Sequence, residues 1–178
     1  MKIVVISADI TKLDSKVDAI VNAANETLMG GGGVDGAIHD AAGPELLKEC
    51  SSLGGCLPGE AKVTKGYNLK NKYIIHTVGP RYYSDPTPEV TLRNAYFNSL
   101  KLADDLGLES VAFPSISTGA FAYPIKEAAE IAIKTISEFH PKNLKTVYIC
   151  IYFNEYLFSV YSDFFKEISR VRSALEKY

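Results

Sequence analysis

The stretch NAANETLMGGGGVDGAIH (residues 22–39) contains four consecutive glycines and one aspartate, Asp35, but no lysine or arginine. Glycine adopts positive φ without a steric penalty and lets the backbone approach a ligand closely. The residues after the glycines, 34–43, have the small-residue pattern of a short helix. Successive N–H groups before a helix N-terminus can bind phosphate without a lysine. The stretch therefore predicts an anion-binding loop between a strand and a helix.

A second loop of similar character, SISTGAFAYP (residues 115–124), follows an apolar segment and precedes another predicted helix. Ser117, Thr118, Gly119 and Ala120 offer backbone and hydroxyl donors. Phe121 lies between small residues, where its ring could stack on a ligand. Because ligands of open α/β sheets bind beyond the carboxyl ends of strands, the two loops are expected at one rim, where they would suit a diphosphate.

Strands and helices alternate along the chain, which predicts an α/β fold with a largely parallel sheet and helices on both faces. At 178 residues, one domain spanning 1–178 is expected. The predicted strands are residues 2–7, 17–23, 60–66, 72–79, 109–116 and 145–153. The predicted helices are residues 34–43, 44–50, 89–106, 124–139 and a last helix that begins near Asn154, a plausible N-cap.

The last predicted helix carries apolar residues at spacings of three and four. Such a stripe is typical of a helix that packs on a core along its length. The stripe consists of Leu157, Tyr161, Phe164, Ile168, Val171 and Leu175.

Composition and charge narrow the class of protein. The formal net charge of −2 argues against a general duplex nucleic-acid binder, which normally has a basic face. Cys50, Cys56 and Cys150 form no CxxC pair and, with three scattered histidines, show no zinc-binding spacing. The N-terminus is expected to be a strand, and no stretch has the apolar length that spans a bilayer. A cytoplasmic protein with reduced thiols and no membrane partner is expected.

Two standard phosphate motifs do not account for the glycines. The P-loop string GxxxxGK[ST] does not occur. GxGxxG occurs at Gly31, Gly33 and Gly36, but NETLM separates it from the preceding strand. The acidic residue expected about twenty positions later is at best Glu60, which begins a strand instead of ending one. A dinucleotide-binding dehydrogenase is therefore disfavoured.

Four polar residues in the first loop have two possible roles each. Asp35 could complement the helix dipole, or it could be a base that activates water beside a phosphorylated ligand. His39, four residues later on the same helix face, is either a partly buried structural histidine or a residue that orients the ligand. Asn22 and Asn25 fit turn chemistry, but their amides could also bind sugar hydroxyls without adding charge.

The ordered set of these motifs resembles the macrodomain family, and its MacroD-type ADP-ribosyl hydrolases in particular. The matching strings extend over nearly the whole chain. They are ADI (8–10), IVNAAN (20–25), GGGGVDGAIHDAAG (30–43), PGEA (58–61), YIIHTVGP (73–80) and PSISTGAFAYP (114–124).

The resemblance implies a three-layer α/β/α fold with a mixed, mostly parallel six-stranded sheet and implies ADP-ribose as the bound unit. Asp9 would accept a hydrogen bond from the adenine amino group, with the backbone of Ile10 beside it. Phe153 would stack near the adenine next to Asn154. This aromatic position varies in the family, so Tyr152 is the alternative to Phe153.

The resemblance also assigns the other end of the ligand. Gly32, Gly33, Val34 and residues 117–121 would hold the diphosphate and the distal ribose, and Asn25 and Asp35 would face that ribose at the scissile ester. Ala122 occupies a position where relatives often have glycine. The extra Cys and His ligands of the zinc-dependent branch are absent, so catalysis without a metal or cofactor is expected.

The first hypothesis is a hydrolase of ester-linked ADP-ribose that acts on O-acetyl-ADP-ribose and on proteins mono-ADP-ribosylated at Asp or Glu. Asp35 would polarise a water molecule, Asn25 would orient the ribose, and His39 would be a third catalytic residue that orients the ligand. The second hypothesis is a non-catalytic ADP-ribose reader, which does not need Asp35. A role in RNA binding would require a basic patch that the composition does not indicate.

Overall fold

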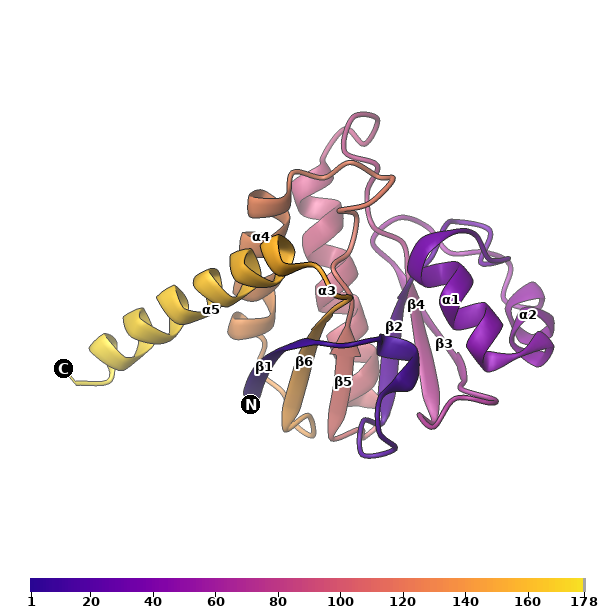
Figure 1. Ribbon diagram of the computed structural model, residues 1–178, viewed down its shortest axis with the longest axis horizontal. Coiled ribbons are helices and arrows are strands. Elements are labelled where there is room, and N and C mark those ends of the chain that lie inside the picture. The colour runs from indigo at the N-terminus through magenta and orange to yellow at the C-terminus, as the bar shows by residue number, and fades with distance from the viewer. Residues whose placement is uncertain (178) are drawn as a thin grey trace.

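The computed structural model describes residues 1–177 and shows a six-stranded sheet between two layers of helices (Figure 1). The strands are Lys2–Ser7 (β1), Ala19–Ala23 (β2), Ala61–Lys65 (β3), Tyr73–Thr77 (β4), Ser110–Phe113 (β5) and Thr146–Ile151 (β6). The helices are Gly33–Ala42 (α1), Pro44–Ser51 (α2), Pro88–Asp105 (α3), Ile125–Glu138 (α4) and Glu155–Leu175 (α5), with a short 3-10 helix at Ile10–Lys12 (η1).

The strand order in the sheet is β1-β6-β5-β2-β4-β3. All neighbouring strands are parallel except β3 and β4, which are antiparallel. The short connection between β3 and β4 explains this exception, since antiparallel neighbours need only a tight turn whereas parallel neighbours need a long crossover. The predicted α/β fold with a mixed, mostly parallel six-stranded sheet is confirmed.

Side chains of the central strands alternate between two hydrophobic cores, because successive residues of a strand point to opposite faces. Val21 and Ile75 pack in the core covered by α3, α4 and α5, whereas Ile20 and Ile74 pack in the core covered by η1, α1 and α2. All four residues are fully buried. The sheet is therefore apolar on both faces, as expected for parallel strands between helical layers.

The carboxyl ends of the five parallel strands meet at one edge of the sheet. From β5 the chain continues through α4 to β6, and from β2 it continues in the opposite direction to α1, α2, β3 and β4 (Figure 1). Neighbouring strands whose connections diverge in this way leave a crevice between their loops, which is where ligands of open α/β sheets bind. Both glycine-containing loops lie at this crevice.

Helix α5 begins as predicted but is not packed along its whole length. Asn154 is its N-cap, since its Oδ1 accepts a hydrogen bond from Leu157 N at 3.0 Å. Tyr161 is fully buried, but Val171 is 56% and Leu175 is 72% exposed. The expectation of a core-facing stripe is therefore wrong for the last two turns. At 21 residues, α5 is longer than the 14-residue α4 on which it packs, and its end projects from the body (Figure 1).

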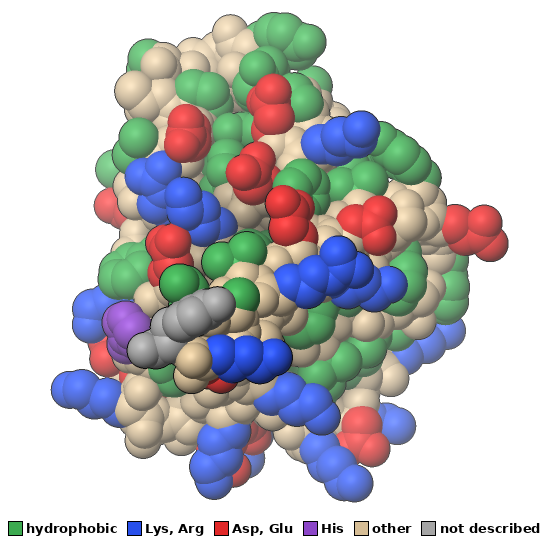
Figure 2. Space-filling view, turned by 90° about the vertical axis from the view of Figure 1, so that its left-hand side faces the viewer, with side chains coloured by type: hydrophobic (Ala, Val, Ile, Leu, Met, Phe, Trp, Pro, Cys, Tyr) green, Lys and Arg blue, Asp and Glu red, His purple; other side chains and the backbone are tan. Residues whose placement is uncertain are grey.

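The surface around the end of α5 carries charges of both signs. Acidic side chains are more frequent in the upper half of this face and basic side chains in its lower half, and hydrophobic side chains are scattered among them (Figure 2). Among residues 1–177, no helix has both the length and the apolarity needed to cross a membrane.

Candidate functional site

A cavity of about 690 Å³ opens at the carboxyl edge of the parallel strands. Its walls come from the segments that follow β1, β2, β4, β5 and β6, which are far apart in the sequence. It has the size of a ligand pocket for a small molecule. The residues predicted to form the site that line this cavity are Asp9, Ile10, Asn25, Gly32, Gly33, Val34, Asp35, Ser117, Thr118, Gly119, Ala120, Phe121 and Asn154.

Three residues expected to contact the ligand, Asn22, His39 and Phe153, are not among the residues that line the cavity. Asn22 is fully buried in β2 and His39 lies further along α1, so both side chains lie behind the wall. Phe153 has a φ of 32° and its ring packs edge-on against Tyr152, with 5.0 Å between ring centroids. Tyr152 lines the cavity in its place, which favours the alternative for the adenine-side aromatic.

Asp35 lies in the first turn of α1, where the partial positive charge of the helix N-terminus stabilises a carboxylate. It is only 5% exposed, yet it borders the cavity. Its Oδ1 accepts a hydrogen bond from Asn22 Nδ2 at 2.8 Å, and His39 Nε2 lies 3.4 Å from the same oxygen. The geometry therefore fixes one carboxylate oxygen against the protein, as a positioned base requires.

A buried histidine stands behind this pair. Asn22 Nδ2 also lies 3.1 Å from His76 Nδ1, and Thr64 Oγ1 lies 2.9 Å from His76 Nε2. Because the amide nitrogen can only donate, Nδ1 is the acceptor and the ring proton is on Nε2. Burial, and next the nearby His39, lower the pKa of His76 to about 3, so its ring is neutral at physiological pH.

The glycine loop is shaped by two different constraints. A Cβ on Gly36 would lie 2.5 Å from the carbonyl oxygen of Gly31, so the close approach of α1 to the loop requires glycine. In contrast, a Cβ on Gly32 or Gly33 would meet nothing within 4 Å, although Gly33 has a φ of 58°. These two residues border the cavity at the start of α1, where helical N–H groups have no carbonyl partner in the helix.

Hydrogen bonds from the core hold the second loop. Ser115 Oγ lies 2.7 Å from Thr118 Oγ1 and 2.8 Å from the buried Tyr161 hydroxyl. Ser117 has a φ of 66°, and its carbonyl accepts from Tyr123 N at 2.9 Å. A non-glycine residue in this region of φ is uncommon and is strained unless its surroundings fix it. The loop is therefore held in one conformation beside the cavity.

Ser117 also presents an unused hydroxyl. Its Oγ is buried and, within residues 1–177, has no hydrogen-bond partner. A Cβ on Gly79 would collide with this atom and with Ile116, so glycine is needed where the segment after β4 passes under the loop. A buried hydroxyl without a partner is costly.

The amide of Asn25 is engaged within its own loop. Its Nδ2 donates to the Gly30 carbonyl at 3.0 Å, and its Oδ1 accepts from Thr27 N at 3.1 Å. These contacts are the turn chemistry that the sequence also allowed. Asn25 nevertheless lines the cavity, and its role toward a ribose stays a prediction.

At the far end of the cavity, Asp9 caps η1. Its Oδ1 accepts from Thr11 N at 2.9 Å and from Thr11 Oγ1 at 2.7 Å, which orients the carboxylate. Cys150 also lines this end, and burial raises the pKa of its thiol to about 11. A thiol with this pKa is protonated at neutral pH, so Cys150 does not have the character of a nucleophile.

Sequence reasoning missed part of the lining, most of which is apolar or small. Small residues directly after strands, at Ala23, Ala24 and Gly79, were the available signal, since they leave room beyond the sheet. Gly31, Ser115 and Ile116 lie within the two predicted loops but were not singled out as site residues. The other missed residues have no local signal. They are Ala8, Thr11, Ala37, Pro114, Cys150, Ile151 and Leu157.

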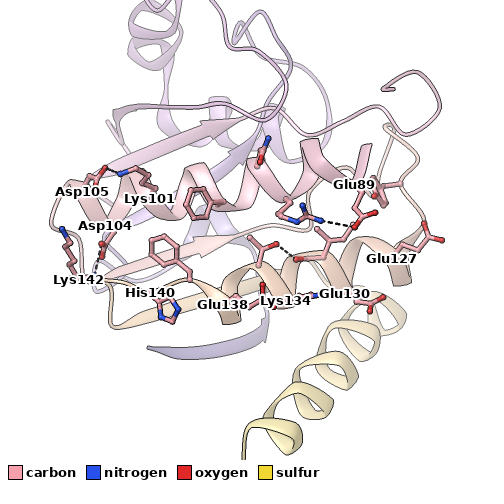
Figure 3. Close-up of a pocket in the computed structure, with 17 residues that line it drawn as sticks. Glu89, Lys101, Asp104, Asp105, Glu127, Glu130, Lys134, Glu138, His140 and Lys142 are labelled. Carbon is pink, nitrogen blue, oxygen red and sulfur yellow. Dashed lines mark hydrogen bonds and ion pairs between the residues drawn. The ribbon is translucent and has the colours of Figure 1, made fainter. Parts of the chain in front are cut away.

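A second hollow, of about 1010 Å³, lies between α3 and α4 (Figure 3). Five of the ten Asp, Glu, Lys and Arg side chains that line it pair with each other or with the backbone. Arg93 binds Glu89 at 3.1 Å, Lys101 binds Asp105 at 2.9 Å, and Asp104 accepts from three backbone N–H groups of residues 142–144. Figure 3 shows these groups along the helices and the adjoining loop without convergence on one point. The hollow therefore lacks the few convergent polar groups of a binding site.

Metal-ligating side chains are dispersed. Within residues 1–177, no three side chains of His, Cys, Asp or Glu are grouped so that they could hold a metal ion.

The chain is similar to known proteins over most of its length. An uncharacterized protein of Fusobacterium nucleatum is 50% identical over 168 residues, which cover 93% of this chain and 95% of that protein. Human ADP-ribose glycohydrolase MACROD2 is 50% identical over 165 residues, which cover 90% of this chain but 38% of that protein.

Solved structures agree with these sequence relationships. The Oceanobacillus iheyensis macrodomain with ADP is 44% identical, with a TM-score of 0.87 over 93% of this chain and 90% of that chain. The Trypanosoma brucei macrodomain in complex with ADP-ribose is 41% identical, with a TM-score of 0.81 over 90% of this chain and 68% of that chain. The Macro domain family model matches residues 21–132. The chain belongs to the macrodomain family.

Proposed function

We propose that this macrodomain binds ADP-ribose and hydrolyses esters of its distal ribose, releasing free ADP-ribose. The substrates would be O-acetyl-ADP-ribose and proteins mono-ADP-ribosylated at Asp or Glu. The observation that carries the proposal is the position of Asp35, a buried carboxylate whose Oδ1 is held by Asn22 at the edge of a cavity that the two glycine-containing loops line. The activity in the names of the MACROD relatives supports the same reaction class.

In this proposal, the glycine loop and the second loop hold the diphosphate through main-chain N–H groups and hydroxyls. Asp35 accepts a proton from water as the water attacks the ester carbonyl. The bond between the carbonyl carbon and the ribose oxygen then breaks, and the proton on Asp35 passes to that oxygen, which yields ADP-ribose and the free acid. Donors of the loops stabilise the negative charge that develops on the carbonyl oxygen. The buried, unpaired cysteines fit a reducing compartment, so we place the reaction in the cytoplasm.

The test compares wild type, Asp35→Ala and Asp35→Asn on O-acetyl-ADP-ribose and on a protein carrying Glu-linked ADP-ribose. A general base contributes on the order of 10²–10⁴ in rate, so kcat should fall by about this factor in both variants. The Kd for ADP-ribose should change only a few-fold. Activity that survives EDTA would support hydrolysis without a metal, and loss of activity on chelation would contradict it.

A non-catalytic reader is the competing function, since the same loops would bind ADP-ribose without turnover. Wild-type protein that binds ADP-ribose but leaves both esters intact would establish the reader and reject the hydrolase. Turnover of only one ester would identify the substrate class that the site accepts.

A further inference from the structure

Arg81 contacts two of the loops that surround the cavity, although it belongs to neither of them. It follows β4, and its Nη1 lies 2.5 Å from Oε1 of Glu26 in the loop after β2. Its Cζ lies 4.5 Å from the centroid of the Phe121 ring, which belongs to the loop after β5 and lines the cavity. The planar guanidinium therefore forms an ion pair and a cation–π contact at the same time.

The strand order places this contact at one end of the cavity. Strand β2 lies between β5 and β4, whereas β1 and β6 lie on the other side of β5. The loops after β2, β4 and β5 are therefore neighbours, and Asp9 and Tyr152 after β1 and β6 lie farther along the edge. Glu26 directly follows Asn25, so the Phe121 ring is held at the end of the cavity that contains Asn25 and Asp35.

The Phe121 segment needs such support because its backbone is strained. Ser117 and Ala122 both have positive φ, 66° and 62°, in a region that favours glycine. Tyr82 N, from the same segment as Arg81, donates to the Phe121 carbonyl at 2.9 Å. The backbone and the ring of Phe121 are thus both held by residues 81 and 82.

Glu26 in turn is fixed by the neighbouring chain. Its carbonyl accepts a hydrogen bond from Cys56 N at 2.9 Å. The hydrogen bond from Arg81 lowers the pKa of its carboxyl group, so the carboxylate stays ionised at physiological pH. Side-chain exposures of 48% for Arg81 and 37% for Glu26 put the ion pair at the rim of the cavity, within reach of solvent.

We propose that Arg81 is a positioning residue that holds the Phe121 ring against the distal ribose of the ligand. Arg81 itself does not line the cavity and acts through Phe121. Its effect should therefore depend on whether the ligand carries the distal ribose. The effect of Arg81 on turnover rests on the proposed function, whereas its effect on affinity requires only that ADP-ribose binds.

The decisive measurement is the Kd of the full chain for ADP-ribose and for ADP, which lacks the distal ribose. Arg81→Gln removes the charge and the stacking cation. A cation–π contact of ordinary strength corresponds to about a three- to thirtyfold change in an equilibrium constant, so the Kd for ADP-ribose should rise by about tenfold. The Kd for ADP should change less than about twofold. Equal losses for both ligands, or no loss for ADP-ribose, would overturn the proposal.

Two further variants separate the contacts of Arg81. Arg81→Lys keeps the charge opposite Glu26 but lacks the planar group that stacks on Phe121, so it should recover only part of the affinity. Glu26→Gln leaves Arg81 in place without its ionic partner and should give a smaller loss than Arg81→Gln. Full recovery by lysine would show that charge alone matters and would contradict a positioning role through the ring.

A double-mutant cycle tests the route through Phe121. The losses of Arg81→Gln and Phe121→Leu should be clearly less than additive, because either change breaks the same contact. Arg93→Gln is the matched control and should leave the Kd for ADP-ribose unchanged. Arg93 is 51% exposed and pairs with Glu89 at 3.1 Å, much as Arg81 pairs with Glu26, but it lies on α3 away from the cavity. Additive losses would reject the proposal.

Turnover provides a separate readout. With an ester substrate, Arg81→Gln should raise KM and lower kcat, because the ribose is bound less tightly and held less well. A wild-type protein without turnover would reject the hydrolase but not the role of Arg81, which the affinity measurements decide without turnover.

Discussion

The Nδ2 atom of Asn22 lies 2.8 Å from Oδ1 of Asp35, so a neutral amide buried in the sheet holds the carboxylate at the edge of the cavity. The same nitrogen faces the neutral ring of His76 at 3.1 Å. The groups behind Asp35, the Asn22 amide and the His76 ring, are therefore polar but carry no positive charge.

Replacing Asn22 by Asp should move the acid limb of the pH–rate profile to higher pH. Two carboxylates within hydrogen-bond distance cannot both ionise readily, and the pair would share a proton with one strongly raised pKa. If ionised Asp35 is the base, the variant should be slow at pH 6 and recover partly at pH 8–9, as measured by kcat on O-acetyl-ADP-ribose. Asn71→Asp, at another buried asparagine, should leave the profile in place. An unshifted profile in Asn22→Asp would argue against Asp35 as the base.

Acidification should destabilise the protein through His76. Its pKa is about 3 in the folded protein, below the ordinary value of 6.5, so the unfolded chain binds more protons between these pH values. The stabilising effect is complete above about pH 6.5 and is lost progressively as pH falls toward 3. Between pH 7 and 5 the free energy of unfolding should drop by about 2 kcal/mol from this residue alone.

Urea denaturation of wild type and His76→Gln at both pH values measures this contribution. The variant is expected to be less stable at pH 7 but to lose less on acidification. His140→Gln, at an exposed histidine, is the control and should behave as wild type. A drop as large in His76→Gln as in wild type would show that other groups cause the acid sensitivity.

The two kinds of glycine in the first loop should separate stability from binding. Gly36→Ala brings a Cβ to 2.5 Å from a backbone carbonyl and should lower the free energy of unfolding by about 1–3 kcal/mol. Gly32→Ala meets nothing in the protein and should cost less than about 1 kcal/mol, but its methyl group borders the cavity. Thermal unfolding and titration with ADP-ribose should therefore rank the variants in opposite orders. The same order in both assays would contradict the role of this loop in binding.

The end of α5 should tolerate polar residues. Val171→Ser and Leu175→Ser should change the free energy of unfolding by less than about 0.5 kcal/mol, because both side chains are largely exposed. Tyr161→Ala, in the same helix but fully buried, should cost about 3–5 kcal/mol. Chemical denaturation measures all three, and a large loss at Leu175 would indicate packing that the structure does not contain.

Local patterns predicted the elements of the fold well because their causes are local. The helix expected at 34–43 is Gly33–Ala42, and the predicted N-cap Asn154 accepts the expected backbone hydrogen bond. The alternation of strands and helices was enough to predict a largely parallel sheet. The pattern could not show where α5 leaves the body, since a stripe with helical spacing reads the same with or without a partner to cover it.

The sequence predicted the site residues that lie within the two loops. It did not predict the contacts between residues that are far apart in the sequence. Asp35 and the second loop were found from their glycines and small polar residues. Arg81 follows an ordinary strand, and its partners Glu26 and Phe121 are 55 and 40 positions away, so no local pattern marks it. Likewise, His76 reads as one residue of an apolar strand until β2 pairs beside it and places Asn22 within reach.

The polarity of the strands leaves the opposite edge of the sheet free for experimental use. The turn between β3 and β4 and the turn at Gly107 before β5 lie at the ends of the strands remote from the cavity, and none of their residues lines it. Lys70 in the first of these turns is exposed. After its substitution by cysteine, a fluorophore or a surface tether could be attached there, and nucleotide binding could be measured without blocking the entrance of the cavity.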